Sequence, residues 1–175
     1  GYLKPITKDL GIYHQKNNLN TQNNKGSCNN TPNNATKNPN IAIIISVGLK
    51  NQAEHETLQT SLDELELLLK TLGIATFSKL IQKKDKFSSS TLMGSGKLDE
   101  ITQIANQVGA GLIVFDQNLT PSQSKNIEDI TKCKVMDRTA VILEIFAKHA
   151  KTKYAKAQVE IAKLQYMLPR MKKAW

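Results

Sequence analysis

The chain has 175 residues, of which 39% are hydrophobic, and a formal net charge of +9. This length suits one globular domain with additional chain and is short for two ordinary domains. No run reaches the roughly 18 apolar residues of a membrane span, and the first residues do not resemble a secretory signal. With only Cys28 and Cys133, a disulfide framework or a cysteine metal site has no support, so we expect a reduced, cytoplasmic location.

The first 40 residues are predicted to lie outside the folded part. Residues 1–13 form a leader whose role the sequence does not indicate. Residues 14–40 contain eleven Asn and almost no apolar residues. Such a segment cannot bury enough surface to offset its backbone entropy, which predicts a disordered linker.

At residue 41 the composition changes abruptly. Residues 41–49 are a continuous, largely β-branched run, typical of a strand buried on both faces of a parallel sheet. Residues 55–73 are predicted to be a helix because leucines recur at spacings of four and three, with Gly73 as a left-handed cap. A second strand is predicted at 74–82, followed by a polar loop at 83–90.

The same alternation continues to residue 137. A helix is predicted at 97–110 and a buried strand at 111–116. Thr120 and Pro121 then form a strong helix start, and a short strand is predicted at 134–137. Strands alternating with helices predict an α/β subdomain over 41–137, with a small four-stranded parallel sheet and helices on both faces.

Residues 138–175 are predicted to form a long basic helix. From Thr139 to Leu168 there is no Gly or Pro, and 30 helical residues would be about 45 Å long, more than this sheet can cover. We therefore expect the helix to project as the first arm of an incomplete antiparallel hairpin. One stripe along this helix is apolar, and a second, nearly opposite, is basic and consists of Lys148, Lys156, Lys163 and Arg170.

Two interpretations of the basic stripe stay open. Net charge is near neutral over residues 41–133 but +7 over 134–175, where ten basic residues stand against three acids. The stripe could be a solvated helix face. Alternatively, Arg170, Lys172 and Lys173 beside Tyr166 and Trp175 could bind nucleic acid, because cations neutralise phosphates and aromatic rings stack on unpaired bases.

The segment Gly94-Ser95-Gly96-Lys97 resembles a phosphate-binding loop. A Walker loop needs a glycine five residues before Gly96 and a hydroxyl residue after Lys97, but Thr91 and Leu98 occupy those positions. The dinucleotide pattern fails as well. We interpret the segment as a turn in which glycine permits positive φ, with anion binding by Gly94, Gly96 and Lys97 as the alternative.

Other catalytic patterns are weak. His14, His55 and His149 have no metal-ligand spacing, so we predict no metal site and no catalytic residues. Asp137-Arg138-Thr139 could form a polar cleft at a strand end. The simpler interpretation is that Asp137 or Thr139 caps the following helix and Arg138 pairs with a nearby acid.

Several motifs in order carry a family resemblance. They are GSGK, FDQNLTPSQ, DRTAVILEIFAKHAKT and QVEIAKLQYMLPR. Over about residues 41–175 the chain resembles the N-terminal domain of the HflX family of ribosome-associated GTPases. The resemblance does not include the Asn-rich extension, and no G domain or Gly/Arg-rich hairpin loop follows Trp175.

The resemblance implies a ribosome-binding portion of a GTP-binding protein that is not an enzyme by itself. It implies large ribosomal subunits and their rRNA as partners, together with a G domain in the same or a separate chain. GTP and Mg²⁺ would belong to that G domain, so no cofactor is expected here. The candidate rRNA-binding residues are Lys148, Lys151, Lys153, Lys156, Lys163, Arg170, Lys172 and Lys173.

Two alternatives belong to other functional classes. The first is a nucleotide-binding α/β domain that uses the loop from Gly94 to Lys97. The second is a protein-interaction module that pairs through the apolar stripe of its C-terminal helix.

Overall fold

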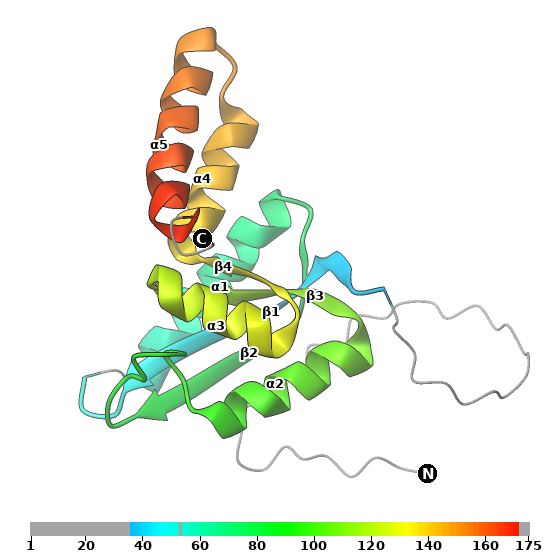
Figure 1. Cartoon of the computed structure of the whole chain (residues 1–175), viewed down its shortest axis with the longest axis vertical. Helices are drawn as coiled ribbons and strands as arrows, with labels where there is room; N and C mark the ends of the chain where they lie inside the picture. Colours follow the sequence, from blue (N-terminus) through cyan, green and yellow to red (C-terminus); the bar gives the residue numbers. More distant parts are fainter. Residues whose placement is uncertain (1–35, 53, 172–175) are drawn as a thin grey trace, which may run out of the picture.

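The structure is a computed structural model that describes residues 36–52 and 54–171. Its strands are β1 (Asn38–Leu49), β2 (Ala75–Lys84), β3 (Ala110–Phe115) and β4 (Lys134–Asp137). Its helices are α1 (His55–Thr71), α2 (Ser95–Val108), α3 (Pro121–Thr131), α4 (Arg138–His149) and α5 (Lys153–Met171). The strands form one parallel sheet in the order β2-β1-β3-β4, with helices on both faces (Figure 1). The predicted α/β class is confirmed.

The inner strand β1 is buried from both sides, as its β-branched run predicts. Ile43 and Ile45 belong to the apolar cluster that α2 and α3 cover, whereas Ala42 and Ile44 belong to the cluster under α1 and α4. All four side chains are fully buried. Because neighbouring residues of a strand point to opposite faces, a strand with helices on both sides needs apolar residues at every position.

Strand β1 starts earlier than the sequence predicts. The backbone N–H of Asn38 donates to the carbonyl of Gly109 (2.7 Å), so pairing reaches residues predicted to be linker. A side chain at Gly111 would lie 2.7 Å from the Asn38 carbonyl, so only glycine permits this approach. Residues 1–35, which include the leader and most of the predicted linker, lie outside the described part of the chain.

The helix boundaries follow local chemistry. Gly73 has φ +74° and follows the end of α1, as predicted. Thr120 caps α3 through a reciprocal pair of hydrogen bonds with Gln123, and Pro121 is the first helical residue, which confirms that start signal. Strand β2 runs to Lys84, two residues into the predicted loop, because Lys83 and Lys84 pair with Gly48 and Leu49.

The C-terminal region is helical as predicted, but the expectation of one uninterrupted helix is wrong. Helix α4 ends at His149, Ala150 has ψ +114°, and α5 begins at Lys153. The two helices run antiparallel and project from the sheet as a helical hairpin whose two arms both lie in this chain (Figure 1). Thr152 supplies the reason, because its Oγ1 accepts from the N–H of Ala155 (3.0 Å) and caps the new helix.

Strand β4 is a short edge strand. The backbone N–H of Val135 donates to Oε1 of Glu128 on α3 (3.2 Å). None of the described helices is long and apolar enough to cross a membrane.

Candidate nucleic-acid interface

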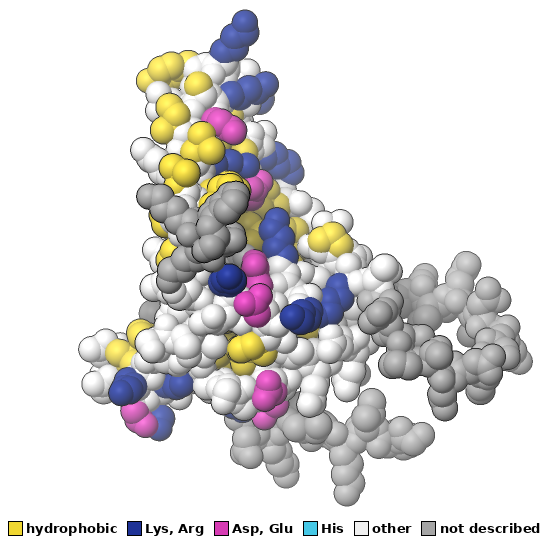
Figure 2. All heavy atoms as spheres, in the orientation of Figure 1, with side chains coloured by type: hydrophobic (Ala, Val, Ile, Leu, Met, Phe, Trp, Pro, Cys, Tyr) yellow, Lys and Arg dark blue, Asp and Glu magenta, His cyan; other side chains and the backbone are white. Residues whose placement is uncertain are grey.

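Three of the candidate lysines lie at the far end of the helical hairpin. Lys151 belongs to the turn between α4 and α5, and Lys153 and Lys156 to the first turn of α5. All three are exposed, and Figure 2 shows Lys and Arg side chains at the outer end of the hairpin. Lys148 is also exposed, and its Nζ donates to the carbonyl of Thr71 at the end of α1.

The other predicted members of the basic stripe turn inward. Lys163 forms an ion pair with Glu144 of α4 (3.0 Å) and is 27% exposed, and Arg170 is 23% exposed. The chain reverses direction after Ala150. Lys163 and Arg170 on α5 therefore do not continue the surface of α4 that carries Lys148. The stripe therefore does not form one solvent-facing row as predicted. Lys172 and Lys173 lie outside the described residues.

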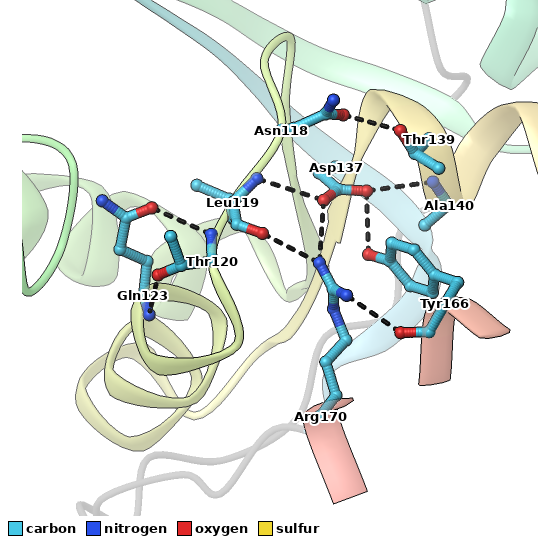
Figure 3. A network of polar contacts seen from close by, with 9 residues as sticks. All are labelled: Asn118, Leu119, Thr120, Gln123, Asp137, Thr139, Ala140, Tyr166 and Arg170. Carbon is cyan, nitrogen blue, oxygen red and sulfur yellow. Dashed lines mark hydrogen bonds and ion pairs between the residues drawn. The ribbon is translucent and has the colours of Figure 1, made fainter. Parts of the chain in front are cut away.

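The helical hairpin is fixed to the sheet by a buried carboxylate, Asp137, at the junction of β4 and α4 (Figure 3). Its Oδ1 accepts from the N–H of Ala140 (2.9 Å), which caps α4, and from the hydroxyl of Tyr166 (2.8 Å). Its Oδ2 accepts from the N–H of Leu119 (3.1 Å) and pairs with Nη2 of Arg170 (3.3 Å). Four donors therefore satisfy a side chain with no solvent exposure.

Arg170 and Tyr166 belong to successive turns of α5 and act together. The Arg170 guanidinium lies 3.7 Å from the centre of the Tyr166 ring and donates to the carbonyls of Tyr166 (2.9 Å) and Leu119 (2.8 Å). Burial, followed by the hydrogen bond to Asp137, raises the pKa of the Tyr166 hydroxyl above its usual value. The junction therefore connects α5 to the loop after β3 and to the start of α4, which orients the hairpin.

The simpler interpretation of residues 137–139 is confirmed. Asp137 caps α4, and Nε of Arg138 donates to Oδ1 of Asp116 (2.9 Å). Arg138 also donates to Ser61 on α1 (3.1 Å to Oγ). Thr139 donates to Asn118 (2.6 Å). These contacts hold the carboxyl ends of β3 and β4 to α1.

From the sequence, Arg170 and Tyr166 belong with the RNA-binding candidates, and their contact with Asp137 is not predicted. Their spacing of four residues places them on one face of α5, and this spacing is a signal for a paired Tyr and Arg. No local pattern indicates that an aspartate 29 residues earlier lies beneath them, because that contact depends on the reversal at Ala150.

Helix α5 carries apolar residues on two opposite faces. Val159, Ala162 and Tyr166 are partly buried on the side of α4. On the other side Ile161, Leu164 and Leu168 are each at least 50% exposed, at spacings of three and four residues. This outer face of α5 has no partner among the described residues.

A groove of about 510 Å³ lies between α3 and the helical hairpin. Its lining includes Lys125, Glu128 and Asp129 from α3 and Glu144 and Lys163 from the hairpin. Charges of both signs line it. The groove therefore does not present the single positive potential that would favour a phosphate backbone.

The segment from Gly94 to Lys97 opens α2, with Gly94 as its N-cap residue at φ −67°. The prediction of positive φ at these glycines is wrong, because the described glycines with positive φ are Gly73 and Gly109, and Leu92 takes that role near the turn with φ +65°. Lys97 pairs with Glu100 (3.4 Å), and the cavity beside it is only about 20 Å³. A bound nucleotide needs a pocket of several hundred Å³.

The histidines give no site in the described part of the chain. His55 and His149 are exposed at the ends of α1 and α4, and His14 lies outside the described residues. Among residues 36–52 and 54–171, no group of His, Cys, Asp and Glu side chains could hold a metal ion.

Comparisons with known proteins identify the family of the chain. The model of the GTP-binding GTPase N-terminal region matches residues 59–147, and the model of the GTP-binding GTPase middle region matches residues 149–175. The boundary between these two regions coincides with the end of α4 at His149. The hairpin therefore joins the two regions, and the contacts of Asp137 with Tyr166 and Arg170 connect one region to the other.

The relatives agree with these matches. GTPase HflX of Flavobacterium psychrophilum is 45% identical over 133 residues, which are 76% of this chain and 32% of that protein. A GTP-binding protein of Sulfolobus solfataricus, solved in complex with GDP, has 26% identity and a TM-score of 0.52 over 75% of this chain and 39% of that one. The SsGBP variant G235S has 26% identity and a TM-score of 0.59 over 76% of this chain and 41% of that one.

The chain spans about a third of the length of the curated relatives it matches. The two family models together span β2, β3, β4 and the helical hairpin. The chain belongs to the HflX family of GTPases, whose N-terminal and middle regions it matches.

Proposed function

We propose that this chain is the rRNA-binding N-terminal portion of an HflX-type GTP-binding protein and that it associates with the large ribosomal subunit in the cytoplasm. The observation that carries the proposal is the lysine group at the far end of the hairpin, Lys151, Lys153 and Lys156, which is exposed and has no acidic partner among the described residues. A projecting basic end can enter a groove of folded RNA while the sheet stays outside. The junction at Asp137 supports this role because it fixes the direction in which the hairpin points.

In this proposal the chain binds and orients, and it carries no catalytic residues of its own. GTP and Mg²⁺ would be bound by a G domain in the same protein or in a separate chain. Ribosome splitting or rescue would be an activity of the whole GTPase. Lys148, Lys163, Arg170, Lys172 and Lys173 stay candidates for rRNA contact, but Lys163 and Arg170 also hold the hairpin in shape.

Co-sedimentation with isolated large ribosomal subunits tests the proposal. Replacing Lys151, Lys153 and Lys156 with Gln should weaken association and lower its salt dependence, by about 0.7 to 0.9 in the log-log slope for each phosphate that is no longer neutralised. A matched control replaces Lys70, Lys132 and Lys134, which are exposed elsewhere, with Gln. Association that does not change with salt concentration would contradict the proposal. So would association that the hairpin variant and the control variant weaken equally.

A second candidate function concerns the outer face of α5. Ile161, Leu164 and Leu168 form an exposed apolar row that fits a second helix better than water. We propose that this row packs against a helix of the remaining middle region in a longer protein, since the matched relatives are more than twice as long as this chain. Leu164→Gln should leave the fold intact and abolish pairing with a supplied middle-region polypeptide; unchanged pairing would contradict it.

A further inference from the structure

A second basic surface lies where β1 and β2 end, on the carboxyl edge of the sheet and away from the helical hairpin (Figure 1). We call it the β2 corner and define it as Lys50, Lys83, Lys84, Lys86 and Phe87. In Figure 2, Lys and Arg side chains gather at this corner, at the lower left, beside acidic and hydrophobic ones. Carboxyl edges of open parallel sheets are common ligand sites.

The charge at the β2 corner is mostly unneutralised. Lys50 pairs with Asp85 (3.3 Å), and their side chains are 60% and 86% exposed, so solvent weakens this pair. Lys83, Lys84 and Lys86 have no ion pair among the described residues. Four lysines against one aspartate leave a local charge of +3.

An aromatic ring lies among these lysines. Phe87 is 41% exposed, and it lines an open hollow of about 600 Å³ with Lys84, Asp85, Lys86, Ser88 and Ser89. An exposed aromatic ring inside a positive patch is the combination that holds single-stranded nucleic acid, because each base has a face to stack and each linkage has a charge to neutralise.

The loop that presents Phe87 is held by several hydrogen bonds. Ser88 and Leu92 exchange two backbone hydrogen bonds of 3.0 Å. Gln123 of α3 donates to the carbonyl of Ser88 (3.1 Å), and Asn126 donates to that of Ser90 (3.0 Å). The ring and its neighbouring lysines therefore stand on a fixed support, which lowers the entropy lost on binding.

We propose that the β2 corner binds single-stranded RNA, with an unpaired base stacked on Phe87 and phosphates paired with Lys84 and Lys86, the two lysines that line the hollow. The hollow is open to solvent, which fits a passing strand better than an enclosed mononucleotide. This surface lies on the α/β subdomain, so it adds a second RNA contact to the one proposed for the hairpin. The observations that support this second contact are separate from those that support the hairpin contact.

The test uses the whole chain and a short fluorescent oligouridine, followed by anisotropy at several salt concentrations. The variant Lys84→Gln, Lys86→Gln should lower the log-log salt slope by about 1.4, at about 0.7 per phosphate. Phe87→Leu keeps an apolar side chain but loses the stack, and should weaken binding by about tenfold at all salt concentrations. Photo-crosslinking of thiouridine-substituted RNA should label the segment around Phe87.

Two controls keep the outcomes distinct. The Gln variant of Lys70 and Lys132, which are exposed elsewhere, removes the same amount of charge and should bind oligouridine as the parent chain does. The hairpin variant at Lys151, Lys153 and Lys156 should lose association with large subunits and keep the crosslink at Phe87. The two proposals can therefore fail separately.

Three results would overturn the inference. One is equal weakening by the corner variant and its charge-matched control, which would mean unspecific attraction. Another is unchanged RNA binding with Phe87→Leu. The third is tight binding of ATP that Lys97→Ala abolishes while RNA binding stays the same, which would assign this edge to a mononucleotide.

Discussion

The hydroxyl of Tyr166 donates to Oδ1 of Asp137 across 2.8 Å, from the last turns of α5 to the residue that caps α4. The same oxygen accepts from the N–H of Ala140, so one oxygen of the residue at the end of β4 both caps α4 and holds the returning arm of the hairpin. Stability and hairpin orientation therefore depend on the same side chain.

Tyr166→Phe should lower the free energy of unfolding by about 1 to 2 kcal/mol, because a buried carboxylate loses one of its four donors. The measurement is urea unfolding followed by circular dichroism. Tyr154→Phe is the control, since Tyr154 is 76% exposed and its change should stay within about 0.5 kcal/mol. A loss at Tyr154 as large as that at Tyr166 would contradict the assignment.

The raised pKa of Tyr166 predicts alkaline sensitivity. A hydroxyl that holds its proton more tightly in the folded state contributes stability that is complete below the unfolded value of about 10 and is lost as pH rises above it. Above pH 10 the free energy of unfolding of the parent chain should fall faster than that of Tyr166→Phe, by up to about 1.4 kcal/mol per pH unit. Partial exposure of Tyr166 to solvent makes the difference smaller. Urea midpoints of both proteins at rising pH measure the difference.

The comparison with Tyr166→Phe separates this effect from that of lysine titration. Burial by itself lowers the pKa of Lys79, but the hydrogen bonds and charges of Asp63 and Glu66 together outweigh it and raise the pKa. This lysine therefore also contributes stability that is lost at high pH. Both proteins contain Lys79, and its contribution cancels in the difference. Parallel pH profiles of the two proteins would mean that Tyr166 does not titrate as proposed.

Two glycines should respond to alanine in opposite ways. Gly96→Ala should raise stability by about 0.5 to 1 kcal/mol, because the position is helical and has open space around it. Gly111→Ala should lower it by about 1 to 3 kcal/mol, since the new methyl group would meet the backbone of Asn38. Thermal and urea unfolding measure both, and a destabilised Gly96→Ala would favour a strained turn at that glycine after all.

Thr152→Ala should weaken the start of α5. It removes the oxygen that accepts from Ala155, at a cost of about 1 kcal/mol. Amide hydrogen exchange should accelerate over the first turn of α5 and stay unchanged in α2. Thr57→Ala, on the exposed surface of α1, is the control, and equal exchange in the two variants would argue against a cap at Thr152.

Much of the fold could be predicted because it depends on local chemistry. A strand buried on both sides must be apolar throughout, as residues 41–47 largely are, and Thr120-Pro121 marks a helix start by its own hydrogen bonds. Such signals do not need the rest of the molecule. The order of the strands in the sheet needs contacts between distant segments, and the sequence indicates only that they are parallel.

The break in the C-terminal helix is hard to predict because no Gly or Pro marks it. Its signals are weaker: Lys148 and His149 at the end of a helix, and Thr152 as a cap without the acidic partner three residues later. If the break is overlooked, every later residue is assigned to a side of one continuous helix that does not exist. That assignment explains why Lys163 and Arg170 are wrongly predicted to lie in one row with Lys148.

The contact between Glu128 and the N–H of Val135 has a consequence for the behaviour of the chain in solution. An edge strand with free N–H groups is a template on which another chain can add a strand, the first step toward aggregates. Glu128 accepts the hydrogen bond of an outward-facing N–H of β4, that of Val135. Its carboxylate also adds negative charge at this edge of the sheet. A single carboxylate on α3 thus makes the β4 edge a poorer template for strand addition by another chain.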